Sequence, residues 1–109
     1  MSTLQRVCFL LKIRESMVEE YKKAHEPVWD EMRKAISSAG IRNYSIFIRK
    51  DGLLVGYFEA DNPEESLRQL GKTEVNTRWQ EHMAPYFEGG SGDMQKGNPE
   101  WLEQIFFLK

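Results

Sequence analysis

The order of strand-like and helix-like segments constrains this chain more than any other feature. Residues 5–13, 42–49, 53–59 and 102–108 carry the apolar patterns of strands, and helical patterns fill the two long gaps between them. The order is strand, helix, strand, strand, helix, strand, with the second helix divided in two. This split βαβ layout predicts an α+β protein of the ferredoxin-like class, a four-stranded antiparallel sheet with its helices on one face.

Short-range signals delimit the first helix. Ser16 followed by Glu19 is a capping box, which predicts a helix that starts at Ser16. Gly40 predicts that this helix ends just before it, because glycine readily adopts the left-handed conformation of a helix stop. Pro27 has no backbone N–H to donate, so it predicts a kink and leaves the carbonyl of Lys23 free.

Turn and cap residues also delimit the second half of the chain. Asp51-Gly52 lies between two apolar strands and predicts a tight hairpin. Asn62-Pro63 predicts the start of a helix that ends near Gly71. Thr73 then predicts the cap of a third helical segment, which runs to about Met83.

Both faces of the predicted strands are apolar. Side chains alternate onto opposite faces of the strands over residues 42–49 and 53–59: Tyr44, Ile46 and Ile48 against Phe47, and Leu54 and Phe58 against Val55 and Tyr57. Helices can cover only one face of a four-stranded sheet, so the other face requires a different cover. We therefore predict a homodimer packed sheet against sheet, an assembly of the dimeric α/β-barrel type.

Composition narrows the classes of partner and location. The chain has 109 residues and a net charge of −2, which suits a single domain over residues 1–109 and argues against nucleic acid and membrane partners. No stretch approaches the roughly 20 apolar residues of a membrane span, and the run 7–11 is too short for a signal peptide. We therefore expect a soluble cytoplasmic protein. Cys8, the single cysteine, cannot form an internal disulfide and is expected to be a small buried apolar residue.

The strongest candidate for chemistry is His25. Tyr21, His25 and Trp29 are spaced four residues apart, so on one helix their side chains form a single stripe. An imidazole between a phenol and an indole is suited to binding a sugar ring and transferring protons to it. The alternative is a partly buried histidine that only packs. The second histidine, His82, lies in a charged helix far along the chain.

Two further aromatic residues are candidates for the same site. Tyr44 opens a strand, and its hydroxyl needs a hydrogen-bond partner if it is buried. Trp79 is a large apolar side chain in a charged helix, and an indole face can cover the C–H side of a sugar. Both residues are also compatible with ordinary packing. Trp101 is expected to anchor the final strand.

Several catalytic motifs are absent from the sequence. It has no Cys/His cluster, no His-x-Glu metal spacing, no phosphate-binding loop and no nucleophile elbow. If the chain is an enzyme, we therefore expect acid–base catalysis without a metal or another cofactor.

At these residues the chain resembles the L-rhamnose mutarotase family. The matching segments run in order along nearly the whole chain: Glu20-Tyr21, His25-Glu26-Pro27-Val28-Trp29, Asn43-Tyr44-Ser45-Ile46, Arg78-Trp79, His82-Met83 and Leu102-Glu103-Gln104-Ile105-Phe106-Phe107-Leu108. The resemblance implies a dimeric α+β protein that interconverts the α and β anomers of L-rhamnose or a closely related deoxy sugar.

The resemblance also implies roles for individual residues. His25 would be the proton donor, while Tyr21 and Tyr44 would hold sugar hydroxyls. Trp79 matches the first residue of a tryptophan pair that contacts the substrate. The second residue of that pair is Gln80 here, which offers a hydrogen bond to the sugar instead of a second aromatic face.

Two other functions are open at the level of sequence. The same dimeric architecture hosts cofactor-free monooxygenases, and a non-catalytic dimer that binds a small ligand would use the pocket without chemistry. The identity of the general base and the role of the glycine-rich loop over residues 89–92 are also open.

Overall fold

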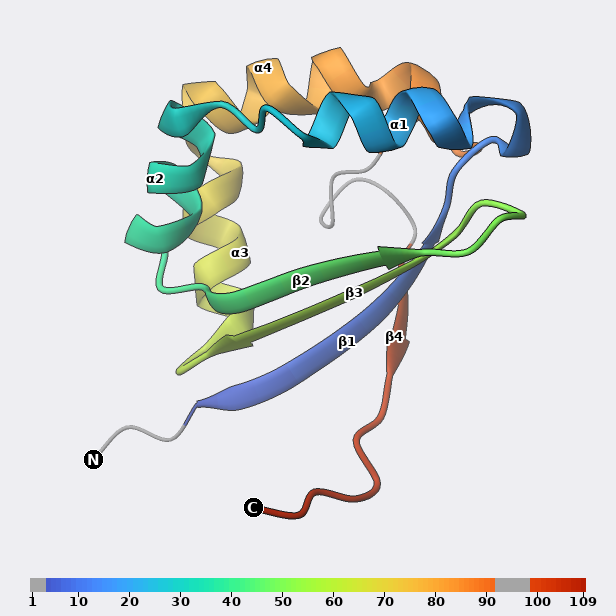
Figure 1. The fold of residues 1–109 in the computed structure, drawn as a ribbon. Coiled ribbons are helices and arrows are strands. Elements are labelled where there is room, and N and C mark those ends of the chain that lie inside the picture. Colours follow the sequence, from blue (N-terminus) through green and yellow to red (C-terminus); the bar gives the residue numbers. More distant parts are fainter. Residues whose placement is uncertain (1–3, 92–98) are drawn as a thin grey trace.

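The computed structural model describes residues 4–91 and 99–109 and has the predicted α+β architecture. Four strands form one antiparallel sheet in the order β2-β3-β1-β4 (Figure 1). The strands are β1 (Gln5–Lys12), β2 (Arg42–Ile48), β3 (Leu53–Ala60) and β4 (Glu100–Leu102). This is the sheet order of a split βαβ fold, in which the first and third strands form the centre.

The helices all lie on one face of the sheet (Figure 1). They are α1 (Val18–His25), α2 (Asp30–Ser38), α3 (Pro63–Gly71) and α4 (Glu74–Met83), with short 3₁₀ turns at Glu15–Met17 and Ala84–Tyr86. The largest side chains with almost no exposure, Phe9, Ile13, Phe58 and Met83, lie between these helices and the sheet.

The predicted first helix is two helices, because Pro27 breaks it completely. Trp29 adopts an extended backbone (φ −54°, ψ 134°), so α2 begins in a new direction after the break (Figure 1). The carbonyl of Lys23 is not left free, since it accepts a hydrogen bond from the Glu26 N–H at 3.2 Å. The prediction of one kinked helix was therefore wrong, because the segment forms two separate helices.

The capping box at Ser16 was also wrong. Ser16 lies inside the 3₁₀ turn that precedes α1, and this turn is closed by a hydrogen bond from the Met17 N–H to the Arg14 carbonyl at 2.8 Å. The helix then starts at Val18, and its first turn has no side-chain cap.

The other local signals are confirmed. Gly40 and Gly52 both have positive φ angles, 90° and 98°, at the helix end and in the hairpin where they were predicted. The Asn62 side chain accepts from the Glu65 N–H at the start of α3. The Thr73 side chain caps α4 in the same way.

The last strand is much shorter than predicted. Only Glu100–Leu102 pair with β1, and residues 103–109 have no regular secondary structure. The segment leaves the sheet, and the Arg6 guanidinium lies 3.4 Å from the centre of the Phe107 ring. The predicted anchoring role of Trp101 agrees with its ring contact to Phe9, at 5.6 Å between centroids.

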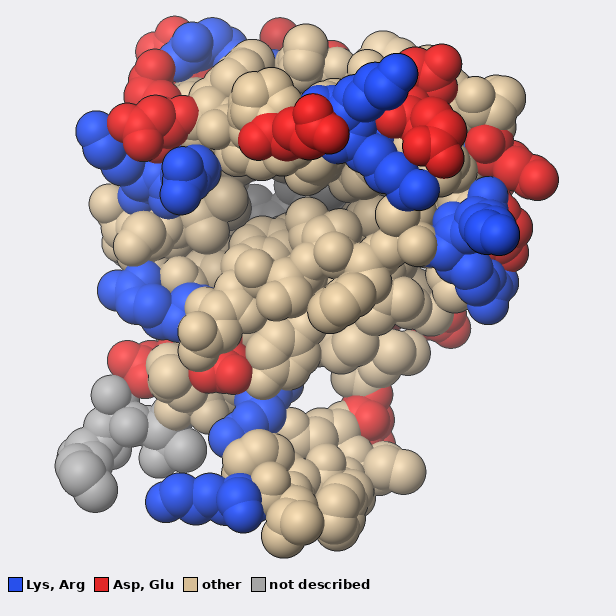
Figure 2. All heavy atoms as spheres, viewed as in Figure 1, with Lys and Arg blue, Asp and Glu red and all other residues tan. Residues whose placement is uncertain are grey.

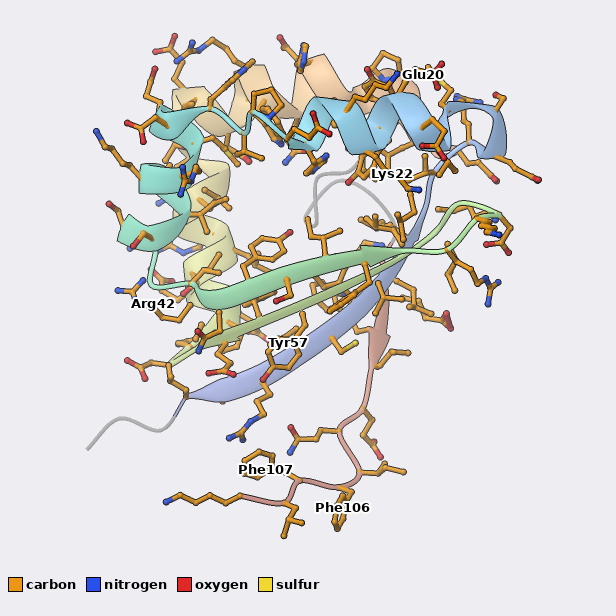
Figure 3. The ribbon with its side chains drawn as sticks, in the orientation of Figure 1. Glu20, Lys22, Arg42, Tyr57, Phe106 and Phe107 are labelled. Atoms are coloured by element: carbon orange, nitrogen blue, oxygen red, sulfur yellow. The ribbon has the colours of Figure 1, made fainter. Side chains whose placement is uncertain are left out.

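The sheet face away from the helices, here called the open face, is not covered by any helix of the described residues, and it carries apolar side chains together with the charged or polar residues Arg6, Lys12, Ser45 and Glu59. Its apolar residues alternate with the buried ones along each strand: Cys8, Leu10, Phe47, Val55, Tyr57 and Leu102. Phe47 is 64% exposed, and Cys8 is half-buried here instead of lying in the core as predicted. Tyr57 projects from this face toward the C-terminal segment (Figure 3). In the view of Figure 2, charged side chains gather over the helices and the hairpin, whereas uncharged ones dominate the strands.

Candidate active site

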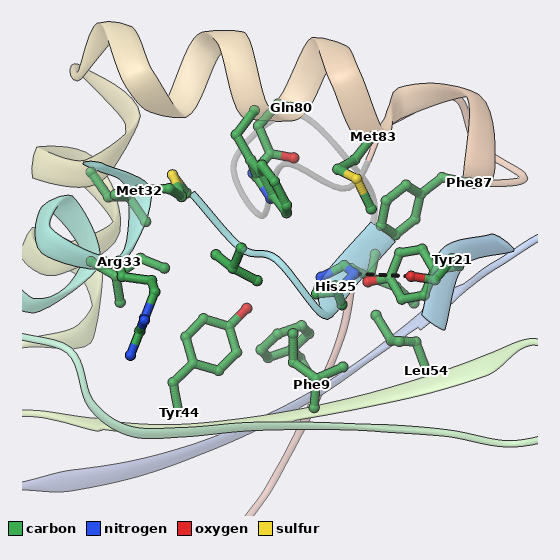
Figure 4. A pocket seen from close by; sticks show the side chains of 16 residues that line it. Phe9, Tyr21, His25, Met32, Arg33, Tyr44, Leu54, Gln80, Met83 and Phe87 are labelled. Carbon is green, nitrogen blue, oxygen red and sulfur yellow. Dashed lines mark hydrogen bonds between the residues drawn. The ribbon is translucent and has the colours of Figure 1, made fainter. Parts of the chain in front are cut away.

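A pocket of about 500 Å³ lies between the helices and the sheet (Figure 4). Most of its wall is aliphatic or aromatic, and a few polar side chains point into it, as in many small-molecule sites. Those polar side chains are Tyr21, His25, Arg33, Tyr44 and Gln80. They come from α1, α2, β2 and α4, so the fold brings together four of its elements at this point.

His25 is the last residue of α1 and has a defined tautomer. Its Nδ1 lies 3.3 Å from the Tyr21 carbonyl oxygen. A carbonyl can only accept, so Nδ1 carries the hydrogen and Nε2 keeps a free lone pair in the neutral ring. Burial lowers the pKa of His25 below 6.5, and the bond to the Tyr21 carbonyl offsets only part of that shift. Near neutral pH the ring is therefore an uncharged base with Nε2 as its acceptor.

The two predicted tyrosines both reach the pocket and stay protonated. Burial raises the pKa of Tyr44 to about 12. Burial, with a smaller contribution from the nearby Tyr44, also raises the pKa of Tyr21. Neither phenol hydroxyl has a hydrogen bond to another residue in the described ranges 4–91 and 99–109. Both are thus available as neutral donors to a ligand and are poor bases.

Trp79 joins the pocket to an aromatic cluster behind it. Its indole is 7% exposed, and its ring centroid lies 5.7 Å from that of His25 and 5.0 Å from that of Trp29. Trp29 does not line the pocket, because the helix break moves it off the face shared by Tyr21 and His25. The predicted stripe of three therefore contributes two residues to the pocket wall, and Trp29 supports Trp79 from behind.

Gln80 lines the pocket beside Trp79. Its Nε2 donates to Oδ1 of Asn76, one helical turn earlier, at 3.2 Å. Figure 4 shows its carboxamide on the α4 side of the pocket. All five residues predicted to form the site are thus brought together in one cavity.

Arg33 is a pocket residue that the sequence reasoning missed. It extends from α2 beside Tyr44 (Figure 4), and it has no ion pair with any residue in the described part of the chain. The spacing of Tyr21, His25 and Trp29 continues to position 33, which is the one signal that pointed there. A charged residue on an amphipathic helix is usually solvated, so this signal alone was weak.

The described residues offer no alternative metal or membrane site. Within ranges 4–91 and 99–109, no group of three His, Cys, Asp or Glu side chains could hold a metal ion. No helix in these ranges is long and apolar enough to cross a membrane. The chemistry available in the pocket is that of an imidazole, two phenols, a guanidinium and a carboxamide.

Comparison with known proteins places this chain in a family. The model of the L-rhamnose mutarotase family matches residues 6–108. The chain belongs to this family. An L-rhamnose mutarotase of Bacillus subtilis is 35% identical over 106 residues, which cover 96% of this chain and 99% of that protein. One from Pectobacterium atrosepticum is 30% identical over 110 residues, covering 94% and 97%.

Solved structures agree with the fold of this family member. The crystal structure of an L-rhamnose mutarotase from Formosa agariphila aligns with a TM-score of 0.79 at 23% identity, covering 96% of this chain and 99% of that one. A dimeric ferredoxin-like protein from an uncultured marine organism aligns with a TM-score of 0.56 at 13% identity, covering 100% and 95%. At these identities the alignments confirm the ferredoxin-like fold alone.

Proposed function

We propose that this protein is a sugar mutarotase that interconverts the α and β anomers of L-rhamnose or a closely related sugar. The observation that carries the proposal is the convergence of His25, Tyr21, Tyr44 and Trp79 on one pocket in a member of the L-rhamnose mutarotase family. The proposal needs no cofactor, because ring opening of a hemiacetal only moves protons.

The resting state of His25 suggests how the protons move. Neutral Nε2 accepts the proton of the anomeric hydroxyl, and the bond between C1 and the ring oxygen breaks as the C1 carbonyl forms. The new imidazolium then donates the same proton to the former ring oxygen. Both oxygens are bonded to C1, so one nitrogen can reach each in turn. After the carbonyl rotates, the reverse steps close the ring as the other anomer. His25 is thus the proton donor predicted from the resemblance, and also the base.

The tyrosines and Trp79 would bind the sugar without exchanging protons. With their raised pKa values, Tyr21 and Tyr44 remain donors to sugar oxygens throughout turnover. The indole of Trp79 would pack against C–H groups of the ring. A stepwise relay through a Tyr21 phenolate is disfavoured, because burial raises the pKa of this hydroxyl.

Anomer-exchange NMR tests this assignment. In saturation-transfer spectra, the rate of enzyme-accelerated anomer exchange should be about 10²–10⁴-fold lower for His25→Ala than for the wild type. This factor is the usual contribution of a positioned acid–base group. His82→Ala is the matched control, since His82 is exposed and outside the pocket, and it should retain most of the activity. Full exchange by a folded His25→Ala protein would contradict the role of His25.

We also propose that the protein is a homodimer that packs through the open face. Phe47 and Leu102 are large exposed apolar side chains on this face, and the segment after Leu102 adds Ile105, Phe106 and Leu108, which are 77–88% exposed. A monomer rarely leaves so much contiguous apolar surface in water. Light scattering should give twice the chain mass, and Phe47→Asp should reduce it to one chain. The cytoplasmic location stays a prediction that cell fractionation would test.

A further inference from the structure

Gln80 combines a fixed orientation with a free acceptor inside the pocket. Asn76, which holds its Nε2, is only 3% exposed, so the carboxamide is positioned from the buried side of α4. The Oε1 atom of Gln80 has no hydrogen bond to any other residue that the structure describes. A half-buried acceptor without a partner favours a ligand that brings a hydroxyl to it.

The position of His25 limits which parts of a sugar can lie near this acceptor. In the proposed mechanism, Nε2 of His25 must reach the anomeric oxygen and the ring oxygen. The ring oxygen is bonded to C1 and C5, so C5 and its exocyclic substituent extend beyond it, away from C1. Trp79 is in ring contact with His25 from α4, and Gln80 follows it on the same helix and in the same pocket wall. The ring carbons that flank this reacting edge are C2 and C5, and C5 carries the exocyclic group by which L-rhamnose differs from its hydroxymethyl counterpart.

We propose that Gln80 sets the specificity of this protein at the C5 substituent, and that the pocket favours a hydroxymethyl group there over the methyl group of L-rhamnose. A hydroxymethyl group donates to Oε1, whereas a methyl group leaves that acceptor desolvated and unpaired. A tryptophan at this position, as in the pair implied by the resemblance, would offer a methyl group an apolar surface instead. This inference rests on the proposed mutarotase function.

The test compares sugars that differ only at this substituent. L-Mannose carries the hydroxymethyl group, L-rhamnose is its 6-deoxy form, and L-lyxose lacks the exocyclic carbon. Anomer exchange of each is measured by saturation-transfer NMR, and the readout is the ratio of kcat/KM for L-mannose to that for L-rhamnose. Gln80→Leu should lower this ratio about tenfold, the effect of one lost hydrogen bond of roughly 1.4 kcal/mol. Gln80→Trp should lower it at least as much. Exchange of L-lyxose should change little in Gln80→Leu.

Controls separate this effect from general damage. Gln69→Leu makes the same chemical change on the exposed side of α3, outside the pocket, and should leave the ratio as in the wild type. If Gln80→Leu does not fold, as judged by circular dichroism, Gln80→Met removes the same carboxamide with a more adaptable side chain.

The outcomes distinguish the two proposals. A lower ratio in Gln80→Leu and an unchanged ratio in Gln69→Leu support the role of Gln80. A ratio that Gln80→Leu and Gln80→Met leave unchanged, while the wild type exchanges both sugars, overturns it and leaves the mutarotase function intact. Wild-type protein that accelerates none of the three sugars overturns both.

Discussion

Both faces of the sheet carry large apolar side chains, but these side chains differ sharply in their burial. On the helix face, Phe9 and Phe58 are at most 1% exposed under four helices. On the open face, Phe47 is 64% exposed, although it belongs to the same sheet and the same kind of alternating strand. The apolar pattern of a strand therefore predicts that a sheet face will be buried, but it does not identify the helix or partner chain that buries it. The cover decides whether the face becomes a core, a pocket or an interface.

The helices do not cover the helix face of the sheet evenly, because the helix layer is interrupted. The break at Pro27 separates α1 from α2, and the pocket lies under this part of the helix layer, with His25 at the end of α1 and Arg33 on α2. An unbroken helix would have kept Trp29 on the face of His25 and reduced the room for a ligand. The break in the helix at Pro27 therefore leaves a ligand pocket where a continuous helix would have packed as part of the core.

A matched pair of phenylalanine truncations should separate the two faces most strongly. Phe58→Ala removes a fully buried ring and should lower the free energy of unfolding by about 3–5 kcal/mol. Phe47→Ala should change the unfolding of the isolated chain by less than about 1 kcal/mol but weaken self-association. Urea denaturation at several protein concentrations measures both effects. Equal losses for the two variants at every concentration would contradict the distinction between the faces.

A glycine on the helix face should be nearly as sensitive. A Cβ atom at Gly56 would lie 2.2 Å from the ring of Phe9, which packs directly over it from the neighbouring strand. Gly56→Ala should therefore cost about 1–3 kcal/mol through overpacking. Gly89→Ala is the control, because no atom lies within 4 Å of a Cβ atom there. Thermal unfolding of both variants checks the difference, and an unchanged midpoint for Gly56→Ala would mean that the Phe9 ring can move away.

Lowering the pH should reduce both the activity and the stability of the protein through protonation of His25 in the pocket. The pKa of His25 is lowered in the folded state, so the unfolded chain binds a proton more readily than the folded one. The stabilising effect of the neutral ring is present above the unfolded pKa of about 6.5 and is lost as the pH falls through the folded pKa. Exchange activity should fall over the same range, since the proposed mechanism starts from neutral Nε2. The pH profiles of kcat/KM and of unfolding measure this, and activity that rises on acidification would indicate that the protonated ring reacts first.

Sequence reasoning succeeded where a structural outcome depends on a few adjacent residues. The hairpin at Asp51-Gly52 and the caps at Asn62 and Thr73 need only the local backbone, and all three are confirmed. The pocket residues Tyr44 and Trp79 come from distant elements, so their meeting with His25 was predictable only through the fold and the family resemblance.

The failures have tertiary causes. The length of the last strand depends on how far β1 offers a partner, and the apolar pattern of residues 102–108 does not contain that information. Arg33 was missed because its only local sign was the four-residue spacing that continues from Trp29, and a charged residue on a helix surface is usually solvated. Ser16 was misjudged because a 3₁₀ turn and the first turn of an α-helix suit the same residues.

The smallest expected effect concerns an ion pair that joins α2, the helix after the break, to α4. Arg78 on α4 pairs with Glu31 on α2 at 3.0 Å, but both side chains are largely exposed, at 48% and 68%. Exposed ion pairs of this kind contribute at most about 1 kcal/mol, so Arg78→Ala should lower the free energy of unfolding by about 0.5 kcal/mol or less, and less again at high salt. The packing of Trp29 against Trp79 then remains to hold α2 in place, and Trp29→Ala should cost several times more in the same denaturation experiment. A larger loss for Arg78→Ala than for Trp29→Ala would mean that charge, and not aromatic packing, holds the broken helix over the pocket.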